Sequence, residues 1–144
     1  MGNLAAFFLA TLIGFPAFAV EFKSSEEILV KLSAYKVEDI NGDAEKVERK
    51  QKLKIDEMFE DLEAAAKYIG KDKISVELAF EIERVSIITF LHDPMTYSAE
   101  LILDVYERNM EIFQTAAKRL HPVDSKLILG VLEGKLDTRK NGQG

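Results

Sequence analysis

Residues 75–92, SVELAFEIERVSIITFLH, decide the fold of this chain. Apolar side chains cover most of the circumference of the helix that this stretch predicts, so we expect it to be the most buried helix. Ser75 is the expected N-cap, and Asp93-Pro94 prevents continuation beyond His92. The apolar residues are Leu78, Ala79, Phe80, Ile82, Val85, Ile87, Ile88, Phe90 and Leu91, and the narrow polar strip is Glu77, Glu81, Arg84 and His92.

Helical spacing of apolar residues continues on both sides of this stretch, and no alternating run predicts a strand. Further helices are expected over residues 24–35, 43–70, 96–120 and 122–134. Long helices joined by short Gly or Pro turns are typical of helix bundles. The sequence therefore predicts an all-α fold, a small antiparallel helical bundle of about five helices, three of them long.

Cap residues support these boundaries. Ser24 and Glu27 form the pattern of a capping box, and Asp43 follows an Asn-Gly turn as the expected N-cap of the second helix. Gly70 is expected at C′ of that helix. Pro122 suits the first position of the last helix, because its missing N–H has no partner there in any case.

The length and composition of the chain are typical of a single globular domain. The chain has 144 residues, of which 47% are hydrophobic and 31% are charged. A formal net charge of -6 disfavours nucleic acid as a partner. Cysteine is absent, which excludes disulfide scaffolds, thiolate metal sites and cysteine nucleophiles.

The N-terminal stretch predicts a cleaved signal peptide. Residues 4–15 are uncharged and mostly apolar, Pro16 breaks the run, and Ala17-Phe18-Ala19 matches an A-x-A cleavage site. The apolar run is shorter than the roughly 20 residues that a membrane-spanning helix needs. We therefore expect cleavage after Ala19, no stable membrane insertion afterwards, and a periplasmic or secreted protein. The expected organisation is a signal peptide over 1–19, a helical domain over 20–136 and a flexible polar tail over 137–144.

The sequence lacks the common motifs for catalysis and metal binding, which favours a protein that is not an enzyme. No Glu-x-x-His pair, HExxH, phosphate-cradling loop or G-x-S-x-G elbow occurs. We expect no cofactor and no metal. Asp39, Asn41 and Asp43 match the first three ligand positions of a calcium loop, but Ala44 and Lys50 stand where that loop needs Gly and Glu. A turn with a helix cap is the favoured interpretation.

Two charged segments are candidate surfaces. Glu100, Asp104, Glu107 and Glu111 follow one another at helical spacing on the outer face of the 96–120 helix, where they suit a basic partner or a solvated face. Five basic residues lie within nine positions between Lys46 and Lys54. Glu48 interrupts them and no aromatic side chain lies among them, so a solvated segment is favoured over lipid or nucleic acid.

Three polar residues occupy unusual positions. His92 and His121 each lie at a predicted helix end, which suits C-terminal capping or, alternatively, a response to pH. Asn109 falls on the apolar face of the 96–120 helix. A buried amide needs a partner, so we expect Asn109 either to make an interhelical hydrogen bond that fixes register or to anchor a ligand.

These observations favour a non-enzymatic exported protein that binds another protein, in an adaptor or regulatory role, as a monomer or homodimer. The alternative is a carrier of a small ligand or haem, in which His92, Met95 or Met110 reaches a pocket between the third and fourth helices.

Cleavage after Ala19 gives the first testable prediction. N-terminal sequencing of exported protein should begin at Val20, because the apolar run and the A-x-A pattern direct cleavage there. Exported material that still begins at Met1 would contradict the prediction.

Overall fold

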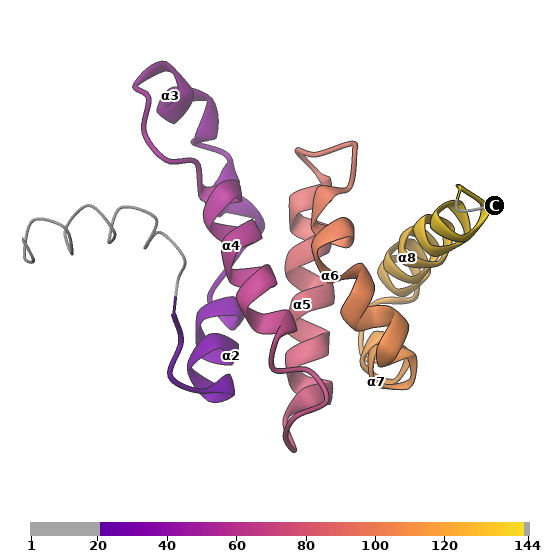
Figure 1. The fold of residues 1–144 in the computed structure, drawn as a ribbon. Helices are drawn as coiled ribbons and strands as arrows, with labels where there is room; N and C mark the ends of the chain where they lie inside the picture. Colours follow the sequence, from indigo (N-terminus) through magenta and orange to yellow (C-terminus); the bar gives the residue numbers. More distant parts are fainter. Residues whose placement is uncertain (1–20, 143–144) are drawn as a thin grey trace, which may run out of the picture.

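The computed structural model describes residues 21–142, and these residues form helices and no strand. The all-α fold class is therefore confirmed. The predicted signal peptide and its cleavage site lie outside the described residues. The elements are α2 (Ser25–Ser33), the short 3-10 helix η1 (Val37–Ile40), α3 (Asp43–Glu48), α4 (Lys54–Ala66), α5 (Ser75–Phe90), α6 (Tyr97–Arg108), α7 (Met110–Ala117) and α8 (Pro122–Gly142) (Figure 1).

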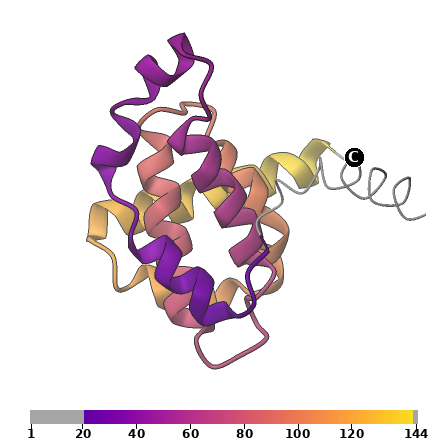
Figure 2. The same ribbon diagram turned by 90° about the vertical axis from the view of Figure 1, so that its left-hand side faces the viewer.

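Helix α5 lies at the centre of the described part, as its apolar circumference predicts. It packs against α2, α4, α6, α7 and α8, and two views at right angles show these helices around it (Figures 1 and 2). Leu78, Ile82 and Val85 are fully buried. Each such side chain contributes about 1.5–3 kcal/mol when removed from water, so α5 is the element on which the others assemble.

Helix α2 is closed at both ends by side chains. The Ser24 hydroxyl accepts a hydrogen bond from Glu27 N, as predicted, whereas the Glu27 carboxylate accepts from Lys23 N and not from the cap residue itself. At the other end, the Arg84 guanidinium of α5 donates to the carbonyls of Leu32 and Tyr35, each at 2.8 Å. Arg84 therefore satisfies acceptors that a helix C-terminus leaves free.

The single helix predicted over residues 43–70 is wrong, because the chain forms two helices, α3 and α4, joined by residues 49–53. Lys50 has a left-handed φ of 57°. Its N–H donates to the Val47 carbonyl, and Gln51 N donates to the Lys46 carbonyl at 2.9 Å. These two bonds form a Schellman motif, which ends a helix. Residues 44–52 offer few apolar side chains to the core, and a short helix without packing is marginal.

Asp43 caps a different helix from the predicted one. Its carboxylate accepts from Lys54 N at 2.9 Å and from Ile55 N at 3.3 Å, so it closes the N-terminus of α4 and not that of α3. The two acceptor bonds tie the start of α3 to the start of α4.

The helix predicted over residues 96–120 is also wrong as a single element. It is divided at Asn109, which has φ -136° and ψ 38° and separates α6 from α7. The Asn109 side-chain amide donates to the Val105 carbonyl at 2.9 Å, while its backbone N–H turns to the Tyr106 carbonyl. The side chain thus takes the acceptor that a continuing helix would give to the backbone.

Helix α8 begins at Pro122, as predicted, and continues to Gly142. The predicted end of this helix near Gly134 is wrong, and residues 137–142 of the predicted flexible tail over 137–144 are helical in the structure. Leu136 is buried against the core, which explains why the helix persists beyond Gly134. Of the five predicted helices, two are divided, and α2, α5 and α8 are continuous. None of the described helices is long and apolar enough to cross a membrane.

The capping role of Asp43 gives a second prediction. Asp43→Ala removes both acceptor bonds and should lower the free energy of unfolding by about 1–2 kcal/mol, whereas Asp43→Asn keeps one acceptor oxygen and should lose less. Urea denaturation measures both changes. Glu45→Ala, at an exposed position on α3, is the control, and an equal midpoint for Asp43→Ala and this control would contradict the capping role.

Candidate functional site

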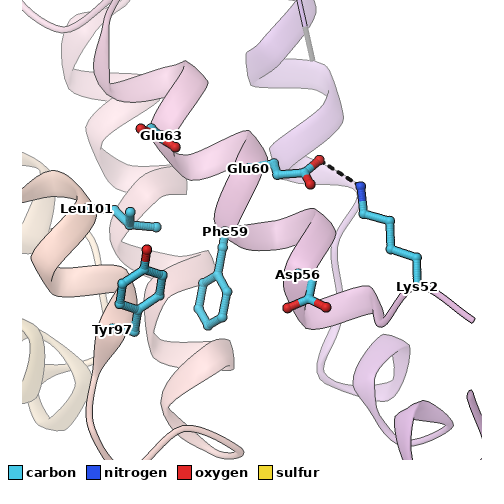
Figure 3. A pocket seen from close by; sticks show the side chains of 7 residues that line it. All are labelled: Lys52, Asp56, Phe59, Glu60, Glu63, Tyr97 and Leu101. Atoms are coloured by element: carbon cyan, nitrogen blue, oxygen red, sulfur yellow. Dashed lines mark hydrogen bonds and ion pairs between the residues drawn. The ribbon is translucent and has the colours of Figure 1, made fainter. Parts of the chain in front are cut away.

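A groove runs between α4 and α6 on the surface of the protein. It has a volume of about 510 Å³. Its floor holds Phe59, Tyr97 and Leu101, which lie side by side in the close view (Figure 3). The rings of Phe59 and Tyr97 meet edge to face, with centroids 5.1 Å apart and planes at 87°. Tyr97 is 49% exposed, so an aromatic surface faces solvent. We name this feature the α4–α6 groove, lined by Lys52, Asp56, Phe59, Glu60, Glu63, Tyr97 and Leu101.

Carboxylates on α4 form the rim of the α4–α6 groove. Asp56, Glu60 and Glu63 follow one another at helical spacing on the same face as Phe59. Glu60 accepts from Lys52 Nζ at 2.7 Å, as the dashed line in Figure 3 marks. Asp56 and Glu63 are exposed and form no ion pair within residues 21–142. Lys52 therefore offsets part of the negative charge of the rim, and the carboxylates of Asp56 and Glu63 stay exposed beside the apolar floor.

A second hollow of about 580 Å³ continues the groove toward the junction of α6 and α7. The two hollows share Glu63 and Leu101. Asn109 lines the second one. The acidic rim and the division between α6 and α7 therefore belong to one continuous surface.

Asn109 does not make the expected interhelical hydrogen bond, because its side-chain donor bond stays within its own turn, to Val105. It is half-buried and not buried on the apolar face as the continuous helix predicted. Its Oδ1 lies over Gly70, where an added Cβ would come within 2.7 Å. Gly70 also has φ 82°, so glycine is required there by conformation and by the close approach of Asn109.

The predicted acidic stripe on the 96–120 helix faces α8 of the same chain along most of its length. Three ion pairs join it to α8: Glu100 to Lys135 at 2.8 Å, Asp104 to Arg139 at 2.5 Å, and Glu107 to Lys140 at 4.0 Å. Glu111 is exposed on α7, beyond the break at Asn109. Three of the four acidic residues that we expected to face a partner therefore form ion pairs within the chain.

The residues considered for haem or another small ligand do not converge. His92 and Met95 are exposed near the start of α6, and Met110 is half-buried beyond its end. A helix of the length of α6 spans about 18 Å at 1.5 Å per residue. Met110 therefore cannot join His92 or Met95 at one iron. His121 is exposed and directly precedes α8. Its Nδ1 accepts a hydrogen bond from Val123 N in the first turn of that helix.

Two of the three positions that match a calcium loop accept backbone hydrogen bonds instead. Asp39 accepts from Lys36 N at 2.8 Å, and Asp43 caps α4. Within residues 21–142, no group of three or more His, Asp or Glu side chains is placed to hold a metal ion.

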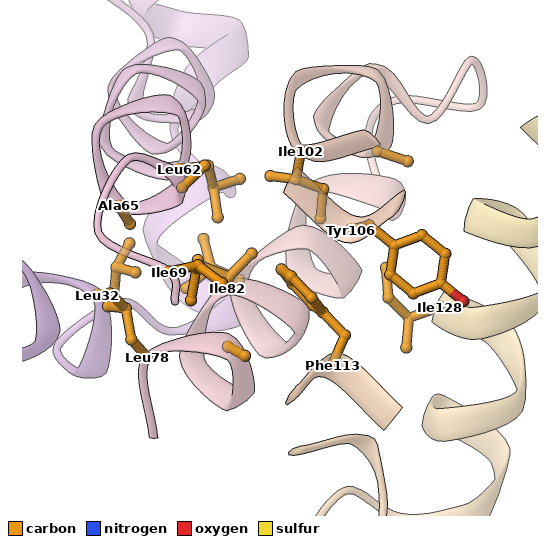
Figure 4. Packing of buried hydrophobic residues seen from close by; sticks show 14 of the residues in the cluster. Leu32, Leu62, Ala65, Ile69, Leu78, Ile82, Ile102, Tyr106, Phe113 and Ile128 are labelled. Carbon is orange, nitrogen blue, oxygen red and sulfur yellow. The ribbon is translucent and has the colours of Figure 1, made fainter. Parts of the chain in front are cut away.

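A buried polar cluster was missed by the sequence analysis. Glu83 of α5 is fully buried, and neither of its carboxylate oxygens has a hydrogen-bond partner within the described residues. The Tyr106 hydroxyl of α6 is likewise buried without a partner, and Figure 4 shows it directed toward α8, beside Ile128. Burial raises the pKa of Glu83 to about 9, so its proton stays in place at neutral pH. The sequence signal for this buried acid is the position of Glu83 four residues from both Ala79 and Ile87.

A second buried acid, Asp61 of α4, contacts the segment that connects α2 and η1. The Tyr35 hydroxyl donates to Asp61 at 2.5 Å, and both residues are buried. Burial raises the pKa of Asp61 despite this bond, and burial together with the Asp61 carboxylate raises the pKa of Tyr35. Asp61 stands between Met58, Leu62 and Ala65 in the apolar stripe of α4, which is the signal that the sequence carried.

Comparisons with known proteins return no relative. No family model, no curated protein and no solved structure matches this chain. The function is therefore argued from the geometry of the described residues.

The buried Glu83 gives a third prediction. The folded state holds the Glu83 proton up to a pH of about 9, whereas an unfolded glutamate loses it near its ordinary pKa of 4.5. The free energy of unfolding should therefore fall as pH rises through this window, by up to about 1.4 kcal/mol per pH unit from this group. Glu83→Gln should lose less stability than the wild type between pH 5 and pH 8, because both pH values lie between 4.5 and about 9.

Urea midpoints at these two pH values measure the difference. Glu77→Gln, at an exposed position of the same helix, is the control and should follow the wild type. Parallel pH profiles for Glu83→Gln and the wild type would show that Glu83 is not held protonated by burial.

Proposed function

We propose that this protein is a non-enzymatic, exported binding protein that holds a basic, amphipathic segment of another protein in the α4–α6 groove. The observation that carries the proposal is the contact between the exposed Tyr97 ring and the half-buried Phe59 ring, beside the carboxylates of Asp56 and Glu63, which form no ion pair within residues 21–142. Exposed apolar patches with polar rims mark interaction sites. Export is proposed from the sequence of residues 1–19.

The chemistry of the groove defines the class of partner. Tyrosine is among the residues that dominate binding energy at interfaces, because its ring buries a large rigid surface. An apolar side chain of the partner would cover Phe59 and Tyr97, while Lys or Arg side chains would meet Asp56 and Glu63. The net charge of -6 favours encounter with a basic partner and disfavours an acidic one.

The groove proposal revises the surface suggested by the sequence. Glu100, Asp104 and Glu107 form ion pairs with basic residues of α8. These carboxylates are therefore less able to attract a basic partner. Asp56 and Glu63 have no such ion pairs within residues 21–142, and they flank aromatic side chains. The binding surface is therefore proposed at α4 and the start of α6, with an adaptor or regulatory role for the complex.

The experiment compares two double variants as baits in the exported fraction of the native host. Tyr97→Ser with Glu63→Lys changes the groove. Leu127→Ser with Glu111→Lys removes an exposed apolar side chain and reverses one acidic charge outside it. Leu127 is 43% exposed, close to the value for Tyr97. We expect a basic protein that binds the wild type and the control variant but is reduced about tenfold or more by the groove variant.

Circular dichroism of both variants checks that each remains folded. Equal capture by the two double variants, or no protein bound in stoichiometric amount to the wild type, would contradict the proposal.

A further inference from the structure

We infer that the partner segment bound in the α4–α6 groove carries opposite charges at its two ends, with basic side chains beside Asp56 and Glu63 and acidic side chains in the second hollow. This inference rests on the proposed function, because it states the order of charges along the segment that the same groove would hold. It begins from the charged residues that line the second hollow, which are Glu63, Lys67, Lys71, Asp104 and Arg108.

The second hollow has an excess of positive charge. Three exposed cations line it and form no ion pair within residues 21–142, namely Lys67, Lys71 and Arg108. Of the two carboxylates in the same lining, Asp104 pairs with Arg139 of α8. The other, Glu63, stands at the boundary with the first hollow, whose lining it shares. A carboxylate brought into the second hollow would therefore meet cations that have no such partner.

Helix α4 changes the sign of its charge along the face that lines the groove. Asp56, Glu60, Glu63 and Lys67 follow one another at intervals of four, three and four residues, which keeps them on one helix face. The carboxylates come first, and Lys67 is the C-cap. The groove is therefore acidic where α4 begins and basic where it ends.

Helix α6 runs in the same direction as α4, so its basic end coincides with that of α4. Phe59 in the first half of α4 meets Tyr97 at the start of α6, and Gly70 after α4 meets Asn109 after α6. Both helices lead from the top of Figure 1 downward. Arg108, the last residue of α6, therefore lines the same hollow as residues that follow α4.

The contact between Gly70 and Asn109 brings the basic residues to one place. An added Cβ at Gly70 would lie 2.7 Å from Asn109 Oδ1, so the turn after α4 and the break after α6 touch each other closely. Lys71 and Arg108 are the chain neighbours of these two residues. Two cations that are 37 positions apart in the sequence thus line one hollow.

The helix dipole accounts for only part of this arrangement. Cations are favoured in the last turn of a helix, and Lys67 and Arg108 occupy such positions. That preference does not apply to Lys71, which lies in the turn between α4 and α5. It also leaves the charged head groups exposed to solvent. A carboxylate among the three cations would gain attraction from each of them.

The floor between the two charged ends is apolar, which completes the description of the partner. Leu101 lines both hollows, so the apolar surface of Phe59 and Tyr97 continues toward the second hollow. Eleven residues separate Asp56 from Lys67, which is about 17 Å along a helix. A helical segment of about 12 residues has this length. Such a segment meets opposite charges at both ends, whereas a uniformly basic one brings like charges together in the second hollow.

Three synthetic peptides of about 12 residues test the charge order. The first groups Lys in one half and Glu in the other around an apolar face, the second has the same composition with Lys and Glu alternating, and the third has Lys at every charged position. All are acetylated and amidated, so that only side chains carry charge. Fluorescence anisotropy with the purified protein should show the first peptide binding about three- to tenfold more tightly than the other two.

Reversal of the second hollow should change this preference. Lys67→Glu with Arg108→Glu makes the whole groove acidic, so the all-Lys peptide should bind this variant about three- to tenfold more tightly than it binds the wild type. A gain in affinity cannot result from unfolding. Lys118→Glu with Lys126→Glu is the control, because it makes the same change in net charge at exposed positions outside the groove. Lys118 is also a C-cap, as Lys67 is, and this control should keep the preference of the wild type.

Equal binding of the three peptides by the wild type, binding of none of them up to about 1 mM, a wild type that prefers the all-Lys peptide, or the same preference in both double variants would overturn the inference. These outcomes leave the proposed function to its own test, which captures a natural basic protein and changes Tyr97 and Glu63. The expected peptide preferences with no natural protein captured would instead contradict the proposed function alone.

Discussion

The burial of α5 on nearly every side is the constraint on which the structure depends. A helix with apolar side chains around most of its circumference is stable in water only when other elements cover it. Each neighbouring helix therefore supplies an apolar face to α5, with Ile28 and Leu32 from α2, Leu62 from α4 and Phe113 from α7 among the fully buried residues. The positions of the surface grooves follow from where these covering helices meet.

Polar groups inside this arrangement determine how the covering helices are joined. Arg84 reaches from α5 to the last carbonyls of α2, and Tyr35 meets Asp61 of α4. These bonds satisfy groups that burial would otherwise leave without a partner. Some buried polar atoms of the described residues lack a hydrogen-bond partner, namely both carboxylate oxygens of Glu83, the Tyr106 hydroxyl and one oxygen of Asp61. The raised pKa of Glu83 keeps that carboxyl neutral. The core therefore combines specific polar contacts with one site that is stable only while it is protonated.

The distribution of charge separates two surfaces of the molecule. Along α6 the acidic residues pair with basic residues of α8, so these charges serve to hold α8 in place. Along α4, Asp56 and Glu63 lie beside the exposed ring of Tyr97 and the half-buried ring of Phe59, and neither carboxylate forms an ion pair within residues 21–142. The proposed function draws on this difference between the two surfaces.

The amino-acid sequence by itself determined the helical class, the central place of α5, the N-cap at Ser24 and the start of α8 at Pro122, because spacing of apolar residues and local capping are properties of neighbouring positions. It also pointed to Asp43 as a cap and to Asn109 as an anomaly. Only the tertiary structure decided that Asp43 caps α4, that Asn109 divides α6 from α7, and that Glu100 and Asp104 pair with α8.

Each of these outcomes depends on a partner far along the chain or on competition between a side chain and the backbone, which periodicity does not encode. The α4–α6 groove is of the same kind. Asp56, Glu60 and Glu63 share one helix face in the sequence, but Tyr97 joins them only because α6 packs beside α4.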